Sequence, residues 1–301
     1  MPEPFPILTI EPEWVKEPET LGTKEKFWFH RPGSDADWLF KFPQPNTGQH
    51  WAERLAAAFA ARLEVMHAAV CLAVFGSERG SATESFTREG RSLVHGNQVL
   101  AGKVAGYSRE KKFRRSDHTF GNVLLAIEGA FLKPERVRRA KSRLADYLVL
   151  DALIGNSDRH DENWGILRKQ TENQVIGGLA PTFDHASSLG RELRDDVSGH
   201  CRRMLIEEDR VGAYSEKARG GIYWESTDKH GLSPLEMVRR ASRQHAEFFA
   251  PALARLQKLD RTVFEEEIAR MPQEWMSPWA RRFAIALLCY NLEELRKLPD
   301  T

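Results

Sequence analysis

One stretch of the chain, Asp151 to Leu167, limits the fold more than any other because it places a charged loop between two apolar elements. Residues 144–154 have the spacing of a buried helix, and residues 164–167 are typical of a short strand. A loop held at both ends by buried elements is a common place for catalytic residues. Four residues separate Asp158 from Asn163. Phosphoryl-transfer sites use this spacing for a carboxylate that orients a hydroxyl and an amide oxygen that binds a metal ion.

The same stretch contains a carboxylate that needs a partner. Asp151 lies on the apolar face of the predicted helix, and a buried carboxylate without a partner is costly. Arg159 and His160 lie close by in the sequence. We expect one or both of them to anchor the loop.

The composition excludes several classes of protein. The chain has 301 residues, 41% of them hydrophobic and 29% charged, which is enough for one large or two small domains. A net charge of +1 gives no reason to expect nucleic acid or an anionic membrane as a partner. The three cysteines, Cys71, Cys201 and Cys289, lack metal or redox spacing and indicate a reducing compartment. No apolar run approaches the ~20 residues of a membrane span, and no leader pattern is present, so we expect a cytoplasmic protein.

The first part of the chain carries a weak phosphate-binding signal. Residues 1–20, rich in proline and glutamate, predict an extended surface arm. Gly22, Thr23 and Lys24 then form a turn before an aromatic strand, and the backbone amides of such a turn suit phosphate. An ordinary hairpin turn is the alternative.

A lysine and a glutamate follow on successive elements. Lys41 lies in a strand at 38–43, on the face opposite the aromatic residues, so it faces either a nucleotide cleft or solvent. Glu53 lies in a helix at 48–64, on a face of alanines rather than among charges. Kinases use a helix glutamate to hold a strand lysine against the nucleotide phosphates. A surface glutamate is the alternative.

The remaining pattern predicts an α+β protein of two lobes with a protein-kinase-like fold. Residues 1–104 form a small β-rich N-lobe with one helix, in which strands at 69–75, 80–86 and 92–100 complete the sheet. A glycine-rich and basic stretch from residue 101 indicates a hinge. Residues 105–301 form a larger, mostly helical C-lobe. Its predicted helices span 122–131, 134–156, 233–256, 261–269 and 277–298.

A second carboxylate follows the loop. A hairpin of residues 164–168 and 174–179 leads to Asp184, which comes after an apolar stretch and before a serine and glycine loop. A second metal-binding carboxylate is expected there, and a turn cap is the alternative. The charged segment 191–230 is interpreted as a surface loop with a short helix, and contact with substrate is the alternative.

The order of these parts is that of kinases, and one motif is more specific. The segment Asp-Ala-Leu-Ile-Gly-Asn-Ser-Asp-Arg-His-Asp-Glu-Asn-Trp-Gly-Ile-Leu, residues 151–167, closely resembles the catalytic loop of HipA-like serine/threonine kinases. These form a toxin-type bacterial family distantly related to phosphoinositide kinases. Residues 21–29 and 93–100 also resemble segments of its shorter members, and the resemblance covers roughly residues 20 to 225. We expect no counterpart here of the extra N-terminal subdomain of the longest members, so their contacts with antitoxin and DNA are not carried over.

The resemblance implies ATP and magnesium as cofactors and a role for each candidate residue. Asp158 would act as the base or orient the acceptor hydroxyl, and Asn163 and Asp184 would bind magnesium. Lys41 would contact the ATP phosphates and be held by Glu53. The turn of Gly22, Thr23 and Lys24 would cover the phosphates. The shape of the loop would depend on Asp151, Arg159 and His160.

The function that we expect is an ATP- and magnesium-dependent transfer of phosphate to serine or threonine of a protein, with an antitoxin-like protein as a further partner. The resemblance also implies autophosphorylation, at Thr20, Thr23, Ser187 or Ser188. One alternative is a small-molecule or lipid kinase, because the same loop serves those acceptors. A second is a catalytically silent kinase fold that works as an interaction module. The presence of all the charged site residues counts against the second.

Overall fold

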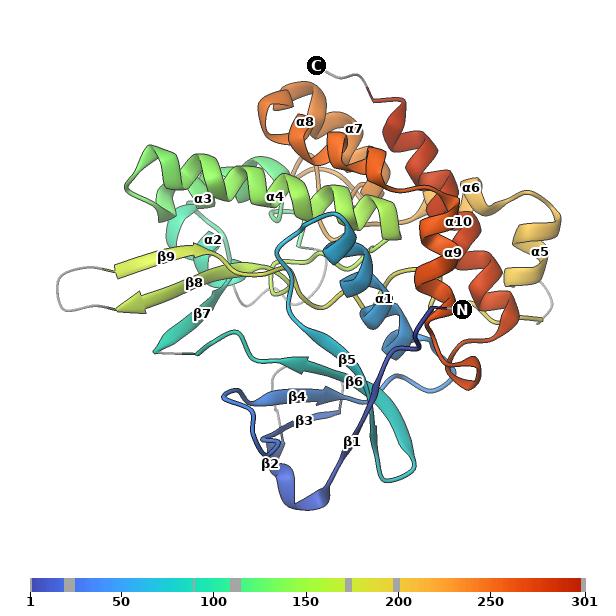
Figure 1. Cartoon of the computed structure of the whole chain (residues 1–301). Helices are drawn as coiled ribbons and strands as arrows, with labels where there is room; N and C mark the ends of the chain where they lie inside the picture. The colour runs from blue at the N-terminus through green and yellow to red at the C-terminus, as the bar shows by residue number, and fades with distance from the viewer. Residues whose placement is uncertain are drawn as a thin grey trace.

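The computed structural model of the chain describes residues 2–18, 25–88, 90–108, 115–170, 175–196 and 201–298. It has a mixed α and β architecture, with a curled sheet in the N-terminal region and a mostly helical C-terminal region (Figure 1). This is the two-lobed, kinase-like fold that the sequence predicts. The turn at Gly22 to Lys24, and Thr20 beside it, lie outside the described residues.

The N-terminal region is built on a six-stranded sheet with the order β1-β5-β6-β4-β3-β2. Strand β1 pairs in parallel with β5, and the other neighbours pair antiparallel. Alternation in the sequence sets the faces of β4, because Trp38 and Phe40 are buried in a small aromatic core while Lys41 lies on the other side. The strands are β1 (Ile7–Ile10), β2 (Val15–Pro18), β3 (Lys26–Phe29), β4 (Trp38–Lys41), β5 (Val70–Phe75) and β6 (Glu78–Glu84).

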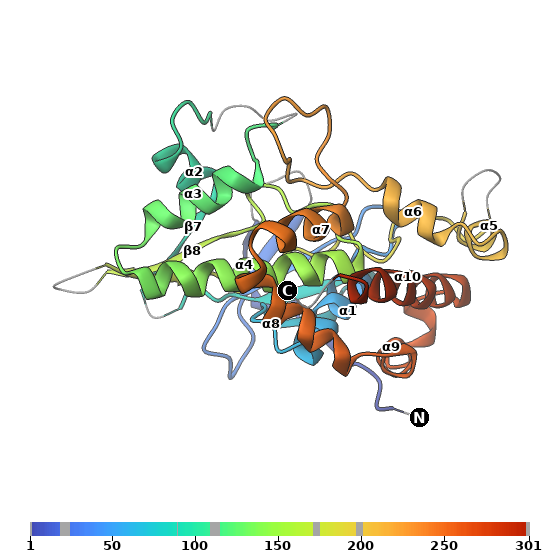
Figure 2. The ribbon, with the colours of Figure 1, turned by 90° about the horizontal axis from the view of Figure 1, so that it is seen from above.

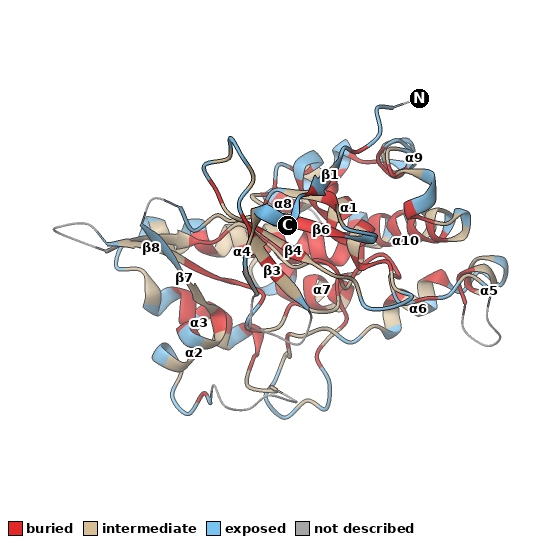
Figure 3. Cartoon of the chain, turned by 90° about the horizontal axis from the view of Figure 1, so that it is seen from below, coloured by how far each residue is buried: buried red, intermediate tan, exposed pale blue. Residues whose placement is uncertain are grey.

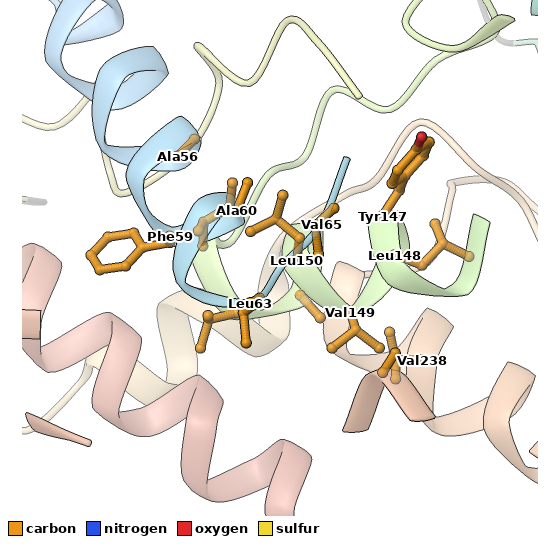
Figure 4. Packing of buried hydrophobic residues seen from close by; sticks show 14 of the residues in the cluster. Ala56, Phe59, Ala60, Leu63, Val65, Tyr147, Leu148, Val149, Leu150 and Val238 are labelled. Carbon is orange, nitrogen blue, oxygen red and sulfur yellow. The ribbon is translucent and has the colours of Figure 1, made fainter. Parts of the chain in front are cut away.

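Helix α1 (Gln49–Arg62) joins this sheet to the rest of the molecule. Its alanines let it lie close to its neighbours, and its larger side chains enter the main core. Figure 4 shows Phe59 and Leu63 of α1 in the same cluster as Leu150 of α4 (Pro134–Ile154). The sheet and the helical region therefore share one hydrophobic core.

The C-terminal region contains a three-stranded antiparallel sheet and most of the helices. Its strands, in the order β7-β8-β9, are β7 (Arg91–His95), β8 (Gly165–Gln170) and β9 (Val175–Leu179). Seen from above, α4 runs through the middle of the helical region (Figure 2). Buried residues concentrate in the interior of the molecule, and exposed residues lie at its outer parts (Figure 3). The other helices are α2 (Gly96–Lys103), α3 (Phe120–Ala130), α5 (Arg202–Glu207), α6 (Val211–Lys217), α7 (Pro234–Gln244), α8 (Ala246–Arg255), α9 (Arg261–Ala269) and α10 (Pro278–Arg296), with short 3-10 turns η1 (Pro12–Trp14), η2 (Leu256–Lys258) and η3 (Gln273–Trp275).

The prediction of a strand at 92–100 in the N-terminal sheet is wrong in two respects: the strand is shorter, and it belongs to the other sheet. Strand β7 ends at His95, and α2 begins at Gly96, where the Gln98 side chain accepts a hydrogen bond from the His95 amide at 3.0 Å. Strand β7 pairs with β8 instead of completing the N-terminal sheet. A short apolar run does not distinguish a strand from the first turn of a helix. The lobe boundary between residues 104 and 105 stays a prediction.

Two other expectations change. Residues 233–256 form two helices rather than one, because the chain turns at His245 so that α7 and α8 both pack against α4. The sequence predicts a surface arm for residues 1–20. Strands β1 and β2 are extended as predicted, but they form the two edges of the sheet.

The beginning of the chain also reaches the helical region. Phe5 is buried, its amide donates to the Arg270 carbonyl at 2.8 Å, and the Arg270 guanidinium lies over the Phe5 ring at 4.3 Å. Arg270 directly follows α9. The first residues therefore connect the edge of the sheet to α9. No helix within the described ranges is long and apolar enough to cross a membrane.

Candidate active site

The loop that carries Asp158 begins where α4 ends. Gly155 has a left-handed backbone, with φ 65° and ψ 36°, which glycine adopts without strain. Asn156 then donates to Asp151 twice, from its backbone amide to the carbonyl and from its side chain to the carboxylate, each at 2.8 Å. The loop continues until β8 begins at Gly165. It is thus fixed to α4 at one end and to the β8-β9 hairpin at the other.

Arg159 is the internal anchor of this loop. Its buried guanidinium binds both carboxylate oxygens of Asp151, through Nε at 2.7 Å and Nη2 at 2.8 Å. Nη1 donates to the carbonyl of Asn163 at 2.6 Å, and Nη2 also donates to Thr182 Oγ1 at 2.8 Å. Burial works to lower the pKa of Arg159, but Asp151 outweighs it and raises that pKa, so the guanidinium stays charged. The partner expected for Asp151 is therefore Arg159.

Asp158 lies on the solvent side of the same loop. Its side chain is 44% exposed, and Ser187 Oγ donates to its Oδ2 at 3.4 Å. Asn163 donates from Nδ2 to the carbonyl of Asp158 at 2.7 Å. This bond uses the nitrogen of the Asn163 amide, so the oxygen is the atom that remains suitable for a cation.

Lys41 comes to this loop from the six-stranded sheet. Its Nζ lies 3.1 Å from Oδ1 of Asp184 and 3.8 Å from Oε2 of Glu53. Burial alone would lower the pKa of Lys41, but the carboxylates of Asp184 and Glu53, with a smaller contribution from Asp158, raise it well above its ordinary value. The lysine is therefore a permanent cation among carboxylates, and it does not face open solvent.

Glu53 connects the lysine to the turn that carries Asp184. Its side chain is buried, and its Oε1 accepts a hydrogen bond from the His185 amide at 3.0 Å. Asp184 itself has a left-handed backbone, φ 58°, which few non-glycine residues adopt and which aspartate tolerates better than most. Such a conformation is kept only where the surroundings hold it. Here Glu53 holds the backbone of the turn, and Lys41 binds the Asp184 carboxylate.

Lys41 thus interacts with three other predicted site residues, Glu53, Asp158 and Asp184. Asn163 is joined to this group by its bond to the Asp158 carbonyl. His160 lies at the edge of this group. Its Nε2 is 3.9 Å from Asp158, and its Nδ1 accepts a hydrogen bond from the Glu162 amide at 3.1 Å. It contributes to the shape of the loop without binding Asp151. Gly22, Thr23 and Lys24 lie outside the described residues, so their expected contact with phosphate stays a prediction.

Asp161, which has no role predicted from the sequence, is completely buried. Its carboxylate accepts hydrogen bonds from Tyr107 and Arg115, and its carbonyl accepts from the Asn97 amide at 2.7 Å. Asp161 therefore ties the loop to the segment that leads into α3 and to the start of α2. One signal was present, because a third acidic residue in a short loop needs a cation, and Arg115 belongs to the basic run preceding α3.

The loop is also packed tightly from outside by two glycines. A Cβ on Gly96 would lie 2.2 Å from the ring of Trp164, and a Cβ on Gly221 would lie 2.7 Å from the amide nitrogen of His160. His118 connects these neighbours, because its Nε2 accepts from Trp164 Nε1 at 3.1 Å and its Nδ1 lies 2.8 Å from the Gly221 carbonyl. The backbone can approach the loop so closely only where no side chain intervenes.

The oxygen ligands and the lysine in this group suit a magnesium nucleotide. Mg²⁺ prefers carboxylate and amide oxygens and is commonly bound by one or two protein ligands plus phosphate and water. The Asn163 amide oxygen and the Asp184 carboxylate match that set, and Lys41 supplies a cation for phosphate. No group of three or more His, Cys, Asp or Glu side chains suited to a metal occurs in the described part of the chain. Two protein ligands would leave the remaining positions on the metal for phosphate and water.

The fold and this arrangement define a kinase-like protein. A family model described as HipA-like C-terminal domain matches residues 20–268, and the chain belongs to that family. A curated relative, serine/threonine-protein kinase CtkA of Helicobacter pylori strain J99, is 32% identical over 114 residues. That alignment covers 38% of this chain and 33% of CtkA, so the chain matches about one third of that relative.

Two solved structures share the fold. The crystal structure of the Helicobacter pylori proinflammatory kinase CtkA superimposes with a TM-score of 0.72 at 21% identity, covering 90% of this chain and 92% of that one. HipA of the Shewanella oneidensis MR-1 toxin–antitoxin system, in complex with HipB and its operator DNA, gives a TM-score of 0.58 at 15% identity. That match covers 96% of this chain and 69% of HipA.

Proposed function

We propose that this protein is an ATP- and magnesium-dependent phosphotransferase of the HipA-like type that transfers phosphate to serine or threonine residues of proteins. The observation that carries the proposal is the grouping of Lys41 with Glu53 and Asp184, beside a loop that presents Asp158 and Asn163. The name of CtkA, a serine/threonine-protein kinase, supports the choice of acceptor.

Each residue of the group has a task in this proposal. Lys41 would bind phosphate oxygens, and Asn163 and Asp184 would hold Mg²⁺. When bound, the magnesium nucleotide supplies the phosphoryl group and offsets its negative charge. Glu53 would keep Lys41 and the Asp184 turn in place, as it does in the structure. Catalysis of this kind depends on positioning and electrostatics more than on covalent chemistry.

Asp158 would orient the acceptor. Its Oδ2 already accepts a hydrogen bond from a serine hydroxyl, that of Ser187, at 3.4 Å. An acceptor hydroxyl in the same place would be held by the carboxylate, which can also take its proton as the new bond forms. The exposure of Asp158 allows a second protein to reach it.

The test is a phosphotransfer assay with γ-labelled ATP and magnesium on purified protein, followed by mass spectrometry. Replacing Asp158 by alanine should lower turnover by about 100-fold or more, because the carboxylate acts on the acceptor, and should leave ATP affinity nearly unchanged. Asp260→Asn is a matched control, because asparagine can replace aspartate as the N-cap of α9. Equal phosphorylation by Asp158→Ala and the unmodified protein would refute the assignment.

The same assay separates the alternatives. Transfer to lipids or metabolites without transfer to protein would indicate a small-molecule kinase. In a separate thermal-shift titration, failure of ATP with magnesium to raise the Tm would indicate a silent interaction module. We also propose an antitoxin-like protein partner, on the basis that the Shewanella HipA structure contains HipB. Co-purification of this chain with such a protein would test that part.

A further inference from the structure

A pocket of about 330 Å³ lies on one side of the loop that carries Asp158. Ser157 lines it from that loop, Glu192 from the segment after Asp184, and Tyr214 and Lys217 from α6. The volume is at the small end of the range for ligand pockets, ~300–1,000 Å³. It suits a few side chains of an acceptor better than a nucleotide. The nucleotide-binding residues, Lys41 and Asp184, are not among those that line it.

The pocket adjoins the residue proposed to orient the acceptor hydroxyl. Ser157 immediately precedes Asp158, and its amide donates to the Ser187 carbonyl at 3.2 Å. Arg219, which also lines the pocket, lies two residues before Gly221, and Gly221 packs so closely on the loop that it leaves no room for a Cβ against Arg159 and His160. An acceptor whose hydroxyl lies at Asp158 would therefore place its neighbouring side chains in this pocket.

Three of the nine residues that line the pocket are cations, and one is a carboxylate, so the lining carries an excess of positive charge. Arg210, Lys217 and Arg219 all contribute to it. Arg210 lies 3.0 Å from Glu208, whereas Lys217 and Arg219 form no ion pair with any residue in the described ranges. Two cations beside the loop that no described carboxylate pairs with attract a negatively charged partner.

The acidic side chain in the pocket is already engaged. The Tyr214 hydroxyl donates to Oε1 of Glu192 at 2.6 Å. Burial, together with the neighbouring Glu192, raises the pKa of Tyr214, so its hydroxyl keeps the proton that makes this bond. This bond orients the Glu192 carboxylate toward Tyr214 without neutralising it, and within the described ranges Glu192 forms no ion pair with Lys217 or Arg219. The three cations of the pocket therefore outnumber its one carboxylate, which favours a negatively charged partner.

We propose that this pocket selects acceptor proteins in which aspartate or glutamate residues flank the phosphorylated serine or threonine. Lys217 and Arg219 bind those carboxylates and are specificity-determining residues. This inference rests on the proposed kinase activity for its meaning but can be measured without it, because binding of an acidic peptide needs no phosphate transfer.

The experiment uses three fluorescent peptides with one central serine, flanked by glutamates, alanines or lysines. Binding to the full chain is measured by fluorescence anisotropy at low and high salt, and transfer by the labelled-ATP assay. We expect the acidic peptide to bind about 5-fold more tightly than the alanine peptide, because exposed ion pairs contribute modestly, and the difference to shrink at high salt. In the transfer assay the preference should appear in KM rather than kcat.

A charge reversal provides the decisive variant. Lys217→Glu with Arg219→Glu should abolish the preference for the acidic peptide and favour the lysine peptide. Lys229→Glu with Arg243→Glu makes the same change in net charge at two exposed positions that do not line the pocket, and it should leave the preference intact.

The outcomes separate this inference from the proposed function. If neither peptide preference nor its reversal is seen in binding, the pocket assignment is wrong, whatever the protein phosphorylates. If the preference is seen but no substrate or self-phosphorylation occurs, the pocket assignment holds and the kinase proposal fails. A single-stranded RNA of equal length that binds more tightly and displaces the acidic peptide would overturn the choice of a protein acceptor.

Discussion

Two carboxylates near Lys41 have different surroundings. Asp184 lies against the lysine in a strained turn, whereas Asp158 is half exposed and accepts a bond from a serine hydroxyl. Phosphoryl transfer needs this difference, since one carboxylate has to bind metal while the other stays available to the acceptor. The same geometry distinguishes two candidate sites of self-modification.

Ser187 is the better candidate of the two adjacent serines. Its hydroxyl lies between Asp158 Oδ2, at 3.4 Å, and Arg191 Nη2, at 3.3 Å, so a phosphate there would have a cation beside it. The Ser188 hydroxyl is buried and donates to the His185 carbonyl at 2.8 Å. We expect mass spectrometry after incubation with ATP to find phosphate on Ser187, and Ser187→Ala to remove that signal.

Ser188→Ala is the matched control and should leave the signal at Ser187 unchanged. Phosphate found on Ser188, Thr20 or Thr23 but not on Ser187 would contradict the prediction. Because both threonines lie outside the described residues, the geometry ranks only the two serines.

At the scale of elements, the loop depends on the ion pair between Asp151 and Arg159. Replacing Arg159 by methionine would leave a buried carboxylate without its partner, which typically costs about 3–5 kcal/mol. We expect a loss of that size in the free energy of unfolding, measured by urea denaturation. Arg261→Met removes an exposed ion pair within α9 and should change stability by less than about 0.5 kcal/mol. Similar losses for both variants would show that the buried pair is not an anchor.

His118 makes stability depend on pH. Burial lowers its pKa from 6.5 to about 4. The unfolded chain therefore binds a proton more readily, so the stability contributed by neutral His118 is present above pH 6.5 and is lost as the pH falls toward 4. The slope is at most about 1.4 kcal/mol per pH unit. Protonation would also remove the acceptor for Trp164 Nε1.

The comparison is with His118→Gln, which keeps a donor and an acceptor but does not titrate. We expect the free energy of unfolding, measured by urea denaturation, to fall more steeply between pH 7 and pH 5 for the unmodified protein than for the variant. His50, whose pKa burial lowers to about 4 as well, titrates equally in both and cancels in the difference. Equal slopes would mean that His118 is not held neutral by the fold.

The sequence predicted the elements with a strong period and missed those set by contacts far apart in the chain. Helix α4 and the hairpin of β8 and β9 follow from hydrophobic periodicity, and the faces of β4 follow from strict alternation. The pairing of β7 with β8 does not follow from the local sequence, because it joins residues that lie far apart in the chain. The role of Asp161 was missed for the same reason, since Tyr107 and Arg115 are brought to it only by the fold.

At the scale of the whole molecule, the proposed nucleotide site lies between the sheet and the helical region. Lys41 comes from β4, while Asn163 and Asp184 come from segments on either side of the β8-β9 hairpin. A ligand that binds all three should stabilise the folded chain, by about 2.7 kcal/mol at a concentration 100-fold above its Kd. We expect ATP with magnesium to raise the Tm of the unmodified protein by several degrees.

Lys41→Met should remove most of this rise in Tm, because it deletes the cation for phosphate. Lys229→Met, at an exposed position, should keep it. A full rise with Lys41→Met would show that nucleotide binds elsewhere. The site residues could be chosen from the sequence one by one, but their convergence depends on the packing of α1 between the two regions, which no local pattern specifies.

The contact between Phe5 and Arg270 bears on how the protein should be expressed. The family match begins at residue 20, yet residues 7–10 and 15–18 form both edges of the six-stranded sheet. A gene that begins at residue 20 but keeps residues 269–301 would lose the connection to α9 and leave the backbones of β5 and β3 exposed, and such bare edges promote aggregation. Insoluble product from a trimmed gene would therefore reflect lost edge strands rather than a flaw in the catalytic region.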